Sequence, residues 1–255
     1  NDSWSTPSVI AESSGWFVNW ADYPSIIGTQ EPIAAHWLNK IPGGKYAYNI
    51  NISTANEAGE WQGPFIPHKD GTATEHGFVS MIPWDANTIL AVWLDGRNTA
   101  YRNADEYYDI SKAMTLRGAL ISTDGTIRQT FLIDDAVCDC CSTSLVKTDN
   151  GAVIAYRNRT DEEIRDIYVS QFDGTEWSKP RAAHKDGWKV GACPVNGPTL
   201  ASADSTVVLA WHTESNENSL AKVAISEDRG TTFGKHVVLN NAPSLGRVGA
   251  ALYND

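Results

Sequence analysis

Two acidic residues, Glu75 and Asp95, stand beside short apolar segments of the sequence. Glu75 comes just before Gly77-Phe78-Val79, and Asp95 follows the run Leu90-Ala91-Val92-Trp93. A carboxylic acid and a carboxylate that face one substrate are the acid and base with which glycosidases cleave a sugar linkage. We therefore take Glu75 and Asp95 as the candidate catalytic pair, with Arg97 or Arg247 binding an acidic group of the substrate.

Histidines and arginines near the same segments supply the candidate binding residues. Guanidinium groups bind carboxylates through two parallel hydrogen bonds, and imidazoles can donate or accept. Each of these side chains could equally be a structural or surface residue. His68 and His184 repeat within the tetrapeptide His-Lys-Asp-Gly, which favours a structural turn for both. The predicted substrate-binding set is His36, His76, Arg97, Arg157 and Arg247.

The four cysteines form a group of their own. Cys138, Cys140 and Cys141 lie within four residues, and Cys193 stands at the corresponding place of the next repeat described below. A structural disulfide in an exported protein is the preferred interpretation. A soft-metal site made of thiolates, with a histidine as a further ligand, is the second, although Cys-x-Cys-Cys differs from the common zinc spacing. Free buried thiols are the third.

The elements that would position these residues are visible as a repeat. Ser226 to Phe233 fits the pattern Ser-x-Asp-x-Gly-x-x-aromatic, and weaker copies begin at Ser53, Ser122 and Ser170, spaced by 69, 48 and 56 residues. Midway through each unit an apolar run ends in Trp37, Trp93, Tyr156 or Trp211. Segments alternating apolar and polar residues follow, which predicts strands. Four strands per unit at this period predict an all-β fold, a β-propeller of four-stranded blades.

The number of repeats suggests that the propeller continues beyond this chain. Four units fit between Trp4 and Phe233, and Gly246 to Tyr253 is predicted as the first strand of a fifth. We expect one propeller domain over residues 1–255, about four and a half blades, with the C-terminal part missing. Because the starts of inner strands converge on a propeller's axis, Asp22, Glu75, the cysteines and Arg247 are expected to share one central site.

The turns resemble the Asp boxes of sialidases and related bacterial-neuraminidase-repeat propellers. Thr74-Glu75-His76-Gly77-Phe78 and Cys138-Asp139-Cys140-Cys141 resemble segments of largely uncharacterised bacterial sialidase-like proteins. The resemblance covers the whole chain and implies a six-bladed propeller, in which Ser226, Asp228 and Gly230 are structural. Sialidases bind the substrate carboxylate with three arginines, but their Arg-Ile-Pro motif is replaced here by Trp16-Phe17-Val18-Asn19-Trp20.

Charge and composition limit the partners. The net charge of −11 argues against nucleic acid and anionic membrane surfaces. No run of 18 apolar residues is present, and the chain begins at Asn1 without Met, as a processed protein would. We expect a secreted or periplasmic protein whose partner is a carbohydrate or glycoconjugate.

Two functions follow from these observations. The first is a sialidase-like, exo-acting glycoside hydrolase on acidic glycans of the sialic-acid type, a reaction that requires no cofactor. The alternative is a non-catalytic propeller that binds a glycan, a metal ion or a protein at its central channel.

Overall fold

The computed structural model describes residues 6–56 and 58–253 and consists almost entirely of strands. The described residues contain no α-helix, and four short 3-10 turns occur in loops: η1 (Arg97–Thr99), η2 (Ala104–Glu106), η3 (Ile110–Lys112) and η4 (Ser215–Glu217). No described helix is long and apolar enough to cross a membrane.

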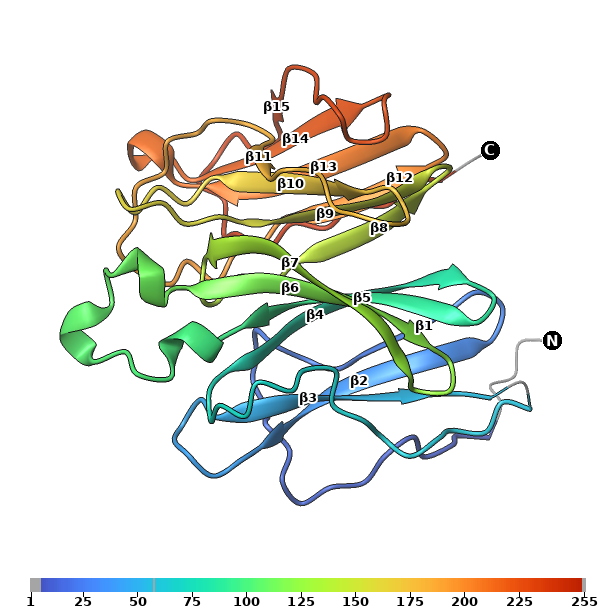
Figure 1. The fold of residues 1–255 in the computed structure, drawn as a ribbon. Helices are drawn as coiled ribbons and strands as arrows, with labels where there is room; N and C mark the ends of the chain where they lie inside the picture. The colour runs from blue at the N-terminus through green and yellow to red at the C-terminus, as the bar shows by residue number, and fades with distance from the viewer. Residues whose placement is uncertain (1–5, 57, 254–255) are drawn as a thin grey trace.

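The strands form four antiparallel sheets, each continuous in the sequence (Figure 1). The first contains β1 (Ser25–Gly28), β2 (Pro32–Lys40) and β3 (Tyr48–Thr54). The second contains β4 (His76–Asp85), β5 (Thr88–Asp95), β6 (Met114–Ser122) and β7 (Ile127–Val137). The third contains β8 (Ser144–Thr148), β9 (Gly151–Arg157), β10 (Ile167–Phe172) and β11 (Arg181–Ala182). The fourth contains β12 (Thr199–Ala203), β13 (Thr206–Thr213), β14 (Leu220–Ser226) and β15 (Val237–Val238).

The predicted blade of four strands is confirmed in three of the sheets. In the first sheet, isolated bridges from Ile52 to Phe65 and from Ala55 to Trp61 take the place of a fourth strand. The aromatic residues predicted to end the second strands lie on β2, β5, β9 and β13, and all four are buried: Trp37, Trp93, Tyr156 and Trp211.

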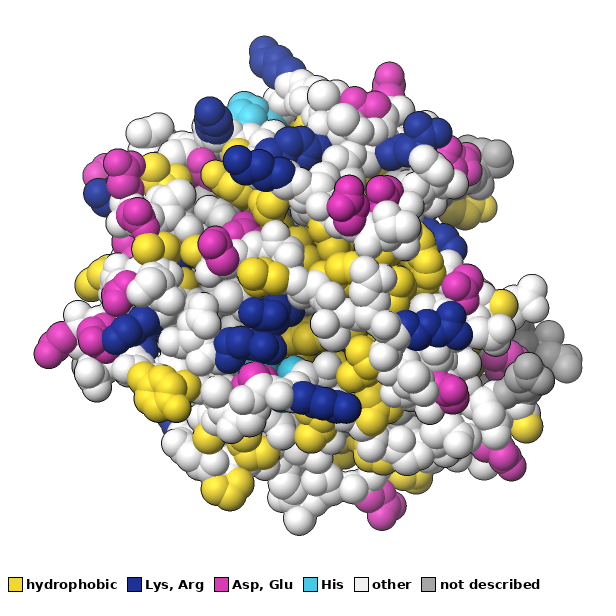
Figure 2. Space-filling view, in the orientation of Figure 1, with side chains coloured by type: hydrophobic (Ala, Val, Ile, Leu, Met, Phe, Trp, Pro, Cys, Tyr) yellow, Lys and Arg dark blue, Asp and Glu magenta, His cyan; other side chains and the backbone are white. Residues whose placement is uncertain are grey.

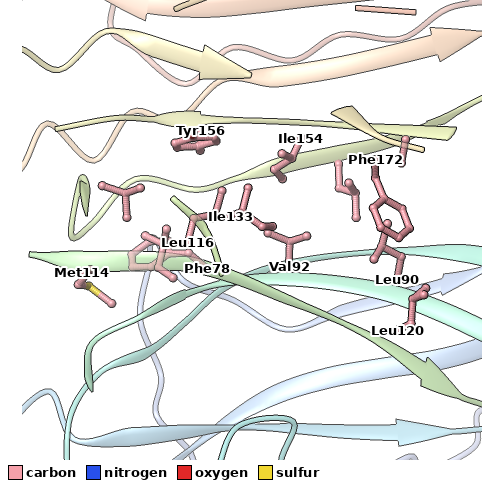
Figure 3. Packing of buried hydrophobic residues seen from close by; sticks show 14 residues of the cluster. Phe78, Leu90, Val92, Met114, Leu116, Leu120, Ile133, Ile154, Tyr156 and Phe172 are labelled. Carbon is pink, nitrogen blue, oxygen red and sulfur yellow. The ribbon is translucent and has the colours of Figure 1, made fainter. Parts of the chain in front are cut away.

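The hydrophobic core lies between the sheets. One cluster joins the first and second sheets, one joins the second and third, and one joins the third and fourth. Figure 3 shows the middle cluster, where Ile154 and Tyr156 of β9 face Val92 of β5 and Leu116 of β6. Because each sheet buries apolar side chains against its neighbours, the sheets stack face to face as the blades of a propeller do.

The first strand of each sheet is the innermost. Contacts link β1 with β4, β4 with β8 and β8 with β12, so these strands follow one another around a common axis. The segment before each inner strand therefore opens toward the same central region. This arrangement confirms the all-β propeller predicted from the repeat.

One expected strand is absent from the described residues. The segment 246–253, predicted as the first strand of a fifth unit, has no strand assignment. A strand is defined by hydrogen bonds to a neighbouring strand, and the described residues supply no such neighbour for this segment. Its Arg247 instead has a left-handed backbone, with φ 51°, and returns toward the first blade.

The turn at Ser226 connects the third and fourth strands of its blade, as predicted. Ser226 Oγ donates to Asp228 Oδ1 at 2.7 Å and accepts from the Gly230 amide at 2.8 Å. Asp228 also accepts from the Thr232 amide and hydroxyl at 2.7 and 2.6 Å. These bonds satisfy the polar groups of the turn locally, which is a structural role.

Candidate active site at the propeller axis

A pocket of about 280 Å³ lies where the segments before the inner strands meet. Its lining comes from the first, third and fourth blades and from the C-terminal segment. The lining residues include Ala21, Tyr23, Cys140, Ser142, Thr143, Val195, Pro198 and Arg247. Of the residues expected to share one site, Cys140 and Arg247 line this space, and Asp22 lies between two lining residues. Glu75 is not part of the lining. We call this space the central pocket.

A buried tyrosine links two acidic residues beside the central pocket. Tyr48 Oη lies 2.5 Å from Glu75 Oε1 and 3.1 Å from Asp22 Oδ2. Asp22 precedes β1, Tyr48 opens β3, and Glu75 precedes β4, so the first two blades meet at this point. The ring of Phe17 stacks on Tyr48 with centroids 3.9 Å apart, which fixes the position of the phenol. We call Asp22, Tyr48 and Glu75 the carboxyl triad.

Both acids of the carboxyl triad resist ionisation. Burial raises the pKa of Asp22 to about 7. Burial also raises the pKa of Glu75 to about 8, and the negative charges of Asp22, Asp139 and Cys193 add to the effect. The phenol has one proton to donate, so a proton retained on one carboxyl relieves both the repulsion and the competition for that donor. Glu75 is therefore protonated at neutral pH, which suits a general acid.

The backbone near Glu75 is shaped around the Asp22 carboxylate. A Cβ placed on Gly77 would lie 1.9 Å from Asp22 Oδ2, so a larger residue at this position would force the Asp22 side chain to move. The next residue, Phe78, has φ 52°, and the pairing of β4 with β5 shifts register between Gly77 and Ser80. Strained residues and bulges of this kind often position functional side chains.

Asp95, the second predicted catalytic residue, belongs to a different network. Its side chain is fully buried and accepts from Trp93 Nε1 at 3.0 Å. Arg97 Nε and Nη2 form two further bonds with it, at 2.7 and 2.8 Å, and these partners keep its pKa below the usual range despite burial. The structure thus places Asp95 and Glu75 on neighbouring strand ends but does not pair their side chains.

The predicted binding residue His76 belongs to the Asp95 network. Its Nε2 lies 3.0 Å from Asp70 Oδ2 and 3.7 Å from Asp95 Oδ1, and its ring stacks on His68 with centroids 3.8 Å apart. The ligand atoms of His68, Asp70 and His76 lie within 4.8 Å of one another, a spacing that could also hold a metal ion. His76 is fully buried and has no exposed edge for a substrate.

His36 and Arg157 lie apart from the central pocket's lining. His36 is hydrogen-bonded to Ser25 Oγ at 2.8 Å, and burial lowers its pKa to about 4. It lines a separate hollow with Trp16 and Trp37 on the first sheet. Arg157 is buried, stacks on Trp188 and donates to the carbonyl oxygens of Asn196, Arg165 and His212.

Arg247 is the predicted arginine that does line the central pocket. It is exposed, its guanidinium lies 4.3 Å from the ring centre of Trp20, and its Nη1 donates to the Trp20 carbonyl at 3.3 Å. Trp20 is 71% exposed, and the guanidinium of the pocket-lining Arg247 covers one face of its ring. Arg97 is partly exposed but is engaged by Asp95.

The four cysteines meet near the same pocket as free thiols. Cys138 Sγ lies 3.2 Å from Cys141 Sγ and 3.9 Å from Cys140 Sγ. Cys193 interacts with Cys140 although it comes from the next blade. The disulfide stays a prediction. The three cysteines of the loop, Cys138, Cys140 and Cys141, lie within 4.8 Å of one another.

Sequence reasoning missed Tyr48 and gave Asp22 only as a residue at the start of an inner strand. Tyr48 belongs to an alternating segment, so its pattern signals a strand and nothing more. The stacked Phe17 and the glycine at position 77 are the sequence signals that could have indicated a packed phenol and a close approach.

The fold is a β-propeller of antiparallel sheets around a common axis. By sequence, the chain matches no family model and no curated protein. Among solved structures, it is similar to a point mutant of the sialidase NanB from Streptococcus pneumoniae, with a TM-score of 0.55 and 11% identity, over 97% of this chain and 56% of that chain. It is also similar to a family 117 glycoside hydrolase from Zobellia galactanivorans, with a TM-score of 0.50 and 12% identity, over 90% of this chain and 74% of that chain.

These similarities establish the fold. The chain spans little more than half the length of the sialidase chain, at 56%. The reaction and the substrate therefore have to be argued from the site itself.

Proposed function

We propose that the protein is a propeller glycoside hydrolase in which Glu75 is the proton donor. The carboxyl triad carries this proposal. Glu75 is half-buried, and its pKa of about 8 keeps the proton at neutral pH. Through Tyr48 it is linked to Asp22, which lies between the pocket-lining residues Ala21 and Tyr23. A carboxylic acid held in this state can protonate the oxygen of a leaving sugar.

The remaining members of the triad tune Glu75. Asp22 is buried, so water screens its negative charge poorly, and this charge raises the pKa of Glu75. Tyr48 holds both carboxyls in place through its hydrogen bonds. After the proton has left, the Tyr48 phenol can donate to the Glu75 carboxylate. The same group can then accept a proton from water, as a glycosidase acid does when it becomes a base. Asp95 is assigned to orienting Arg97, because its oxygens are already bonded.

The mouth of the central pocket favours a carbohydrate with an acidic group. The exposed face of Trp20 offers an apolar platform, and Arg247 beside it offers a guanidinium for a carboxylate. Figure 2 shows basic and acidic side chains interspersed over the face it draws, without a broad basic surface for a polyanion. We infer an exo-acting enzyme that takes one acidic sugar at a time, of the sialic-acid type or a uronic acid.

The test is turnover of fluorogenic glycosides by the full-length protein. The panel contains a sialoside, a uronide and neutral sugars, and the matched variants are Glu75→Gln and Glu227→Gln. Glu227 is exposed on the turn after β14. Loss of general acid catalysis lowers rates by about 10²–10⁴, so Glu75→Gln should lose that much while Glu227→Gln remains unchanged. Equal activity of the two variants would refute the role of Glu75.

A non-catalytic glycan-binding propeller is the second candidate. The exposed Trp20 and Arg247 favour it, because both are placed for binding and neither needs a reaction. It predicts saturable binding of an acidic glycan, weakened by Arg247→Gln, with no turnover of any substrate in the panel.

A further inference from the structure

The cysteine cluster, defined as Cys138, Cys140, Cys141 and Cys193, is more than a set of buried thiols. Its first three members occupy the loop between β7 and β8, and their sulfur atoms all lie within 4.8 Å of one another. Cys138 and Cys141 are buried, Cys140 is half-buried and lines the central pocket, and Cys193 is exposed. Three sulfur atoms from one loop are thus already gathered around one point.

Positive charge surrounds the cluster without sufficient negative partners. Arg159 and Arg165 are buried, and the Nη1 atom of each lacks a hydrogen-bond partner among the described residues. Glu163 binds the other side of both guanidinium groups, at 2.7 and 2.6 Å. Asp139, within the cysteine loop, lies 3.5 Å from Arg159 Nη1 and also binds Arg102 at 2.8 Å. Three guanidinium groups thus share two carboxylates, and the remaining positive charge is costly unless a further anion is close by.

We propose that Cys138, Cys140 and Cys141 form a thiolate site for a soft metal ion of the Zn²⁺ or Cu⁺ class, with Cys193 as a fourth, exchangeable ligand. Thiolates are the ligands these ions prefer. Zn–S bonds of about 2.3 Å place tetrahedral thiolates about 3.8 Å apart, close to the 3.2 and 3.9 Å found here. The ligands need only small side-chain shifts to close around an ion.

The net charge of the cluster distinguishes a bound metal ion from a disulfide. Three thiolates with Zn²⁺ carry a net charge of −1, and with Cu⁺ a net charge of −2, so either complex would neutralise the arginines. A disulfide is neutral and would leave Arg159 and Arg165 facing uncharged sulfur. Cys193 comes from the segment before β12, so a bound ion would also link the third and fourth blades.

The experiment uses the full-length protein, reduced and freed of metal under anaerobic conditions. Zn²⁺ and Cu⁺ are titrated separately, and Co²⁺ serves as the spectroscopic probe. We expect one ion per chain, thiolate-to-cobalt charge-transfer absorption, and protection of the cluster from a thiol reagent. The free protein should show four reactive thiols, and the loaded protein at most one.

Matched variants locate the ion. Cys141→Ser should weaken binding by at least about tenfold, whereas Cys193→Ser should keep the ion but release it faster to a chelator. Ser142→Ala, beside the cluster, should bind as the unmodified protein does. Because Cys141→Ser could affect folding, thermal unfolding of the unmodified protein with and without Zn²⁺ gives a second readout, and a rise in Tm is expected.

Three results would overturn the proposal. One is four reactive thiols at saturating Zn²⁺ and Cu⁺. Another is a metal-free disulfide that leaves two titratable thiols in the protein as purified. The third is metal uptake that survives Cys141→Ser and disappears in His76→Gln, which would place the ion at His68, Asp70 and His76.

Discussion

Tyr48 Oη lies 2.5 Å from Glu75 Oε1, which joins the third strand of the first blade to the residue that precedes the second blade. The same phenol reaches Asp22, so one buried hydroxyl serves two carboxyls. Since the hydroxyl has a single proton, the ionisation of one acid depends on the other. The Tyr48–Glu75 hydrogen bond therefore affects the protonation state of both carboxyls and also connects the first two blades.

Replacing Tyr48 with Phe should move the pH profile of the reaction. The Tyr48 phenol lowers the pKa of Glu75, which burial has raised to about 8. Without the phenol the ionised form is less stable, so the alkaline limb of kcat/KM should shift above its position in the unmodified protein. Tyr46→Phe, which alters an exposed tyrosine of the same segment, should leave the profile unchanged. A limb that moves down would contradict this assignment.

Stability should fall as the pH rises through neutrality. The folded-state pKa values of Asp22 and Glu75, about 7 and about 8, exceed their ordinary values of 3.8 and 4.5. Their protonated forms stabilise the folded state below pH about 4, and this contribution is lost as the pH passes 7 to 8. In Glu75→Gln the loss between pH 5 and 9 should be smaller, by a few kcal/mol. Denaturant unfolding at both pH values measures it, and an identical pH dependence would contradict it.

The architecture was accessible from the sequence because the blades repeat their landmarks. Trp37, Trp93, Tyr156 and Trp211 recur at corresponding places, and each is buried on the second strand of its blade. Gly246 to Tyr253 failed as a strand, since alternating apolar residues form one only when a partner strand is available. The sequence repeat thus predicts the blades well, whereas the pairing of a strand depends on whether a neighbouring strand is present.

The site was accessible only in part. The position of Glu75 beside an inner strand followed from the repeat, as did the meeting of the cysteines with Arg247. The partners of Asp95 could not be read in advance, because Trp93 and Arg97 could have pointed elsewhere on the same strand end. The Tyr48 contact depends on packing between residues 26 and 27 positions apart, which local patterns do not encode.

Gly77→Ala should damage the carboxyl triad directly. The new methyl group would meet Asp22 Oδ2 at 1.9 Å and Tyr48 Cε2 at 2.9 Å, so the carboxylate has to move. We expect a loss of about 2–3 kcal/mol in the free energy of unfolding. Because the closest clash is with the Asp22 side chain, Asp22→Ala should be less harmful in the Gly77→Ala background than in the unmodified protein. Strictly additive effects in this double-mutant cycle would contradict the proposed contact.

Arg157 and Arg247 should behave in opposite ways when each is replaced by Gln. Arg157 is buried and holds three backbone carbonyls, so its loss should cost about 3 kcal/mol or more of stability. Arg247 is exposed, so its loss should change stability by less than about 0.5 kcal/mol. It should instead raise KM for an acidic glycoside and leave KM for a neutral one unchanged. A stable Arg157→Gln protein, or equal KM effects on both substrates, would contradict these roles.

The turn at Asp228 should matter for stability and not for activity. Asp228 accepts three hydrogen bonds within the turn, from the Ser226 hydroxyl and from the amide and hydroxyl of Thr232. Asp124, in the weaker copy of the turn, accepts a hydrogen bond from the Thr126 amide at 2.9 Å. Asp228→Ala should therefore cost about 1–3 kcal/mol, and Asp124→Ala should cost clearly less. Denaturant unfolding gives both values. Activity per folded molecule should be unchanged, because the turn lies between β14 and β15 and none of its residues lines the central pocket. A loss of turnover in folded Asp228→Ala protein would instead tie the turn to the central pocket.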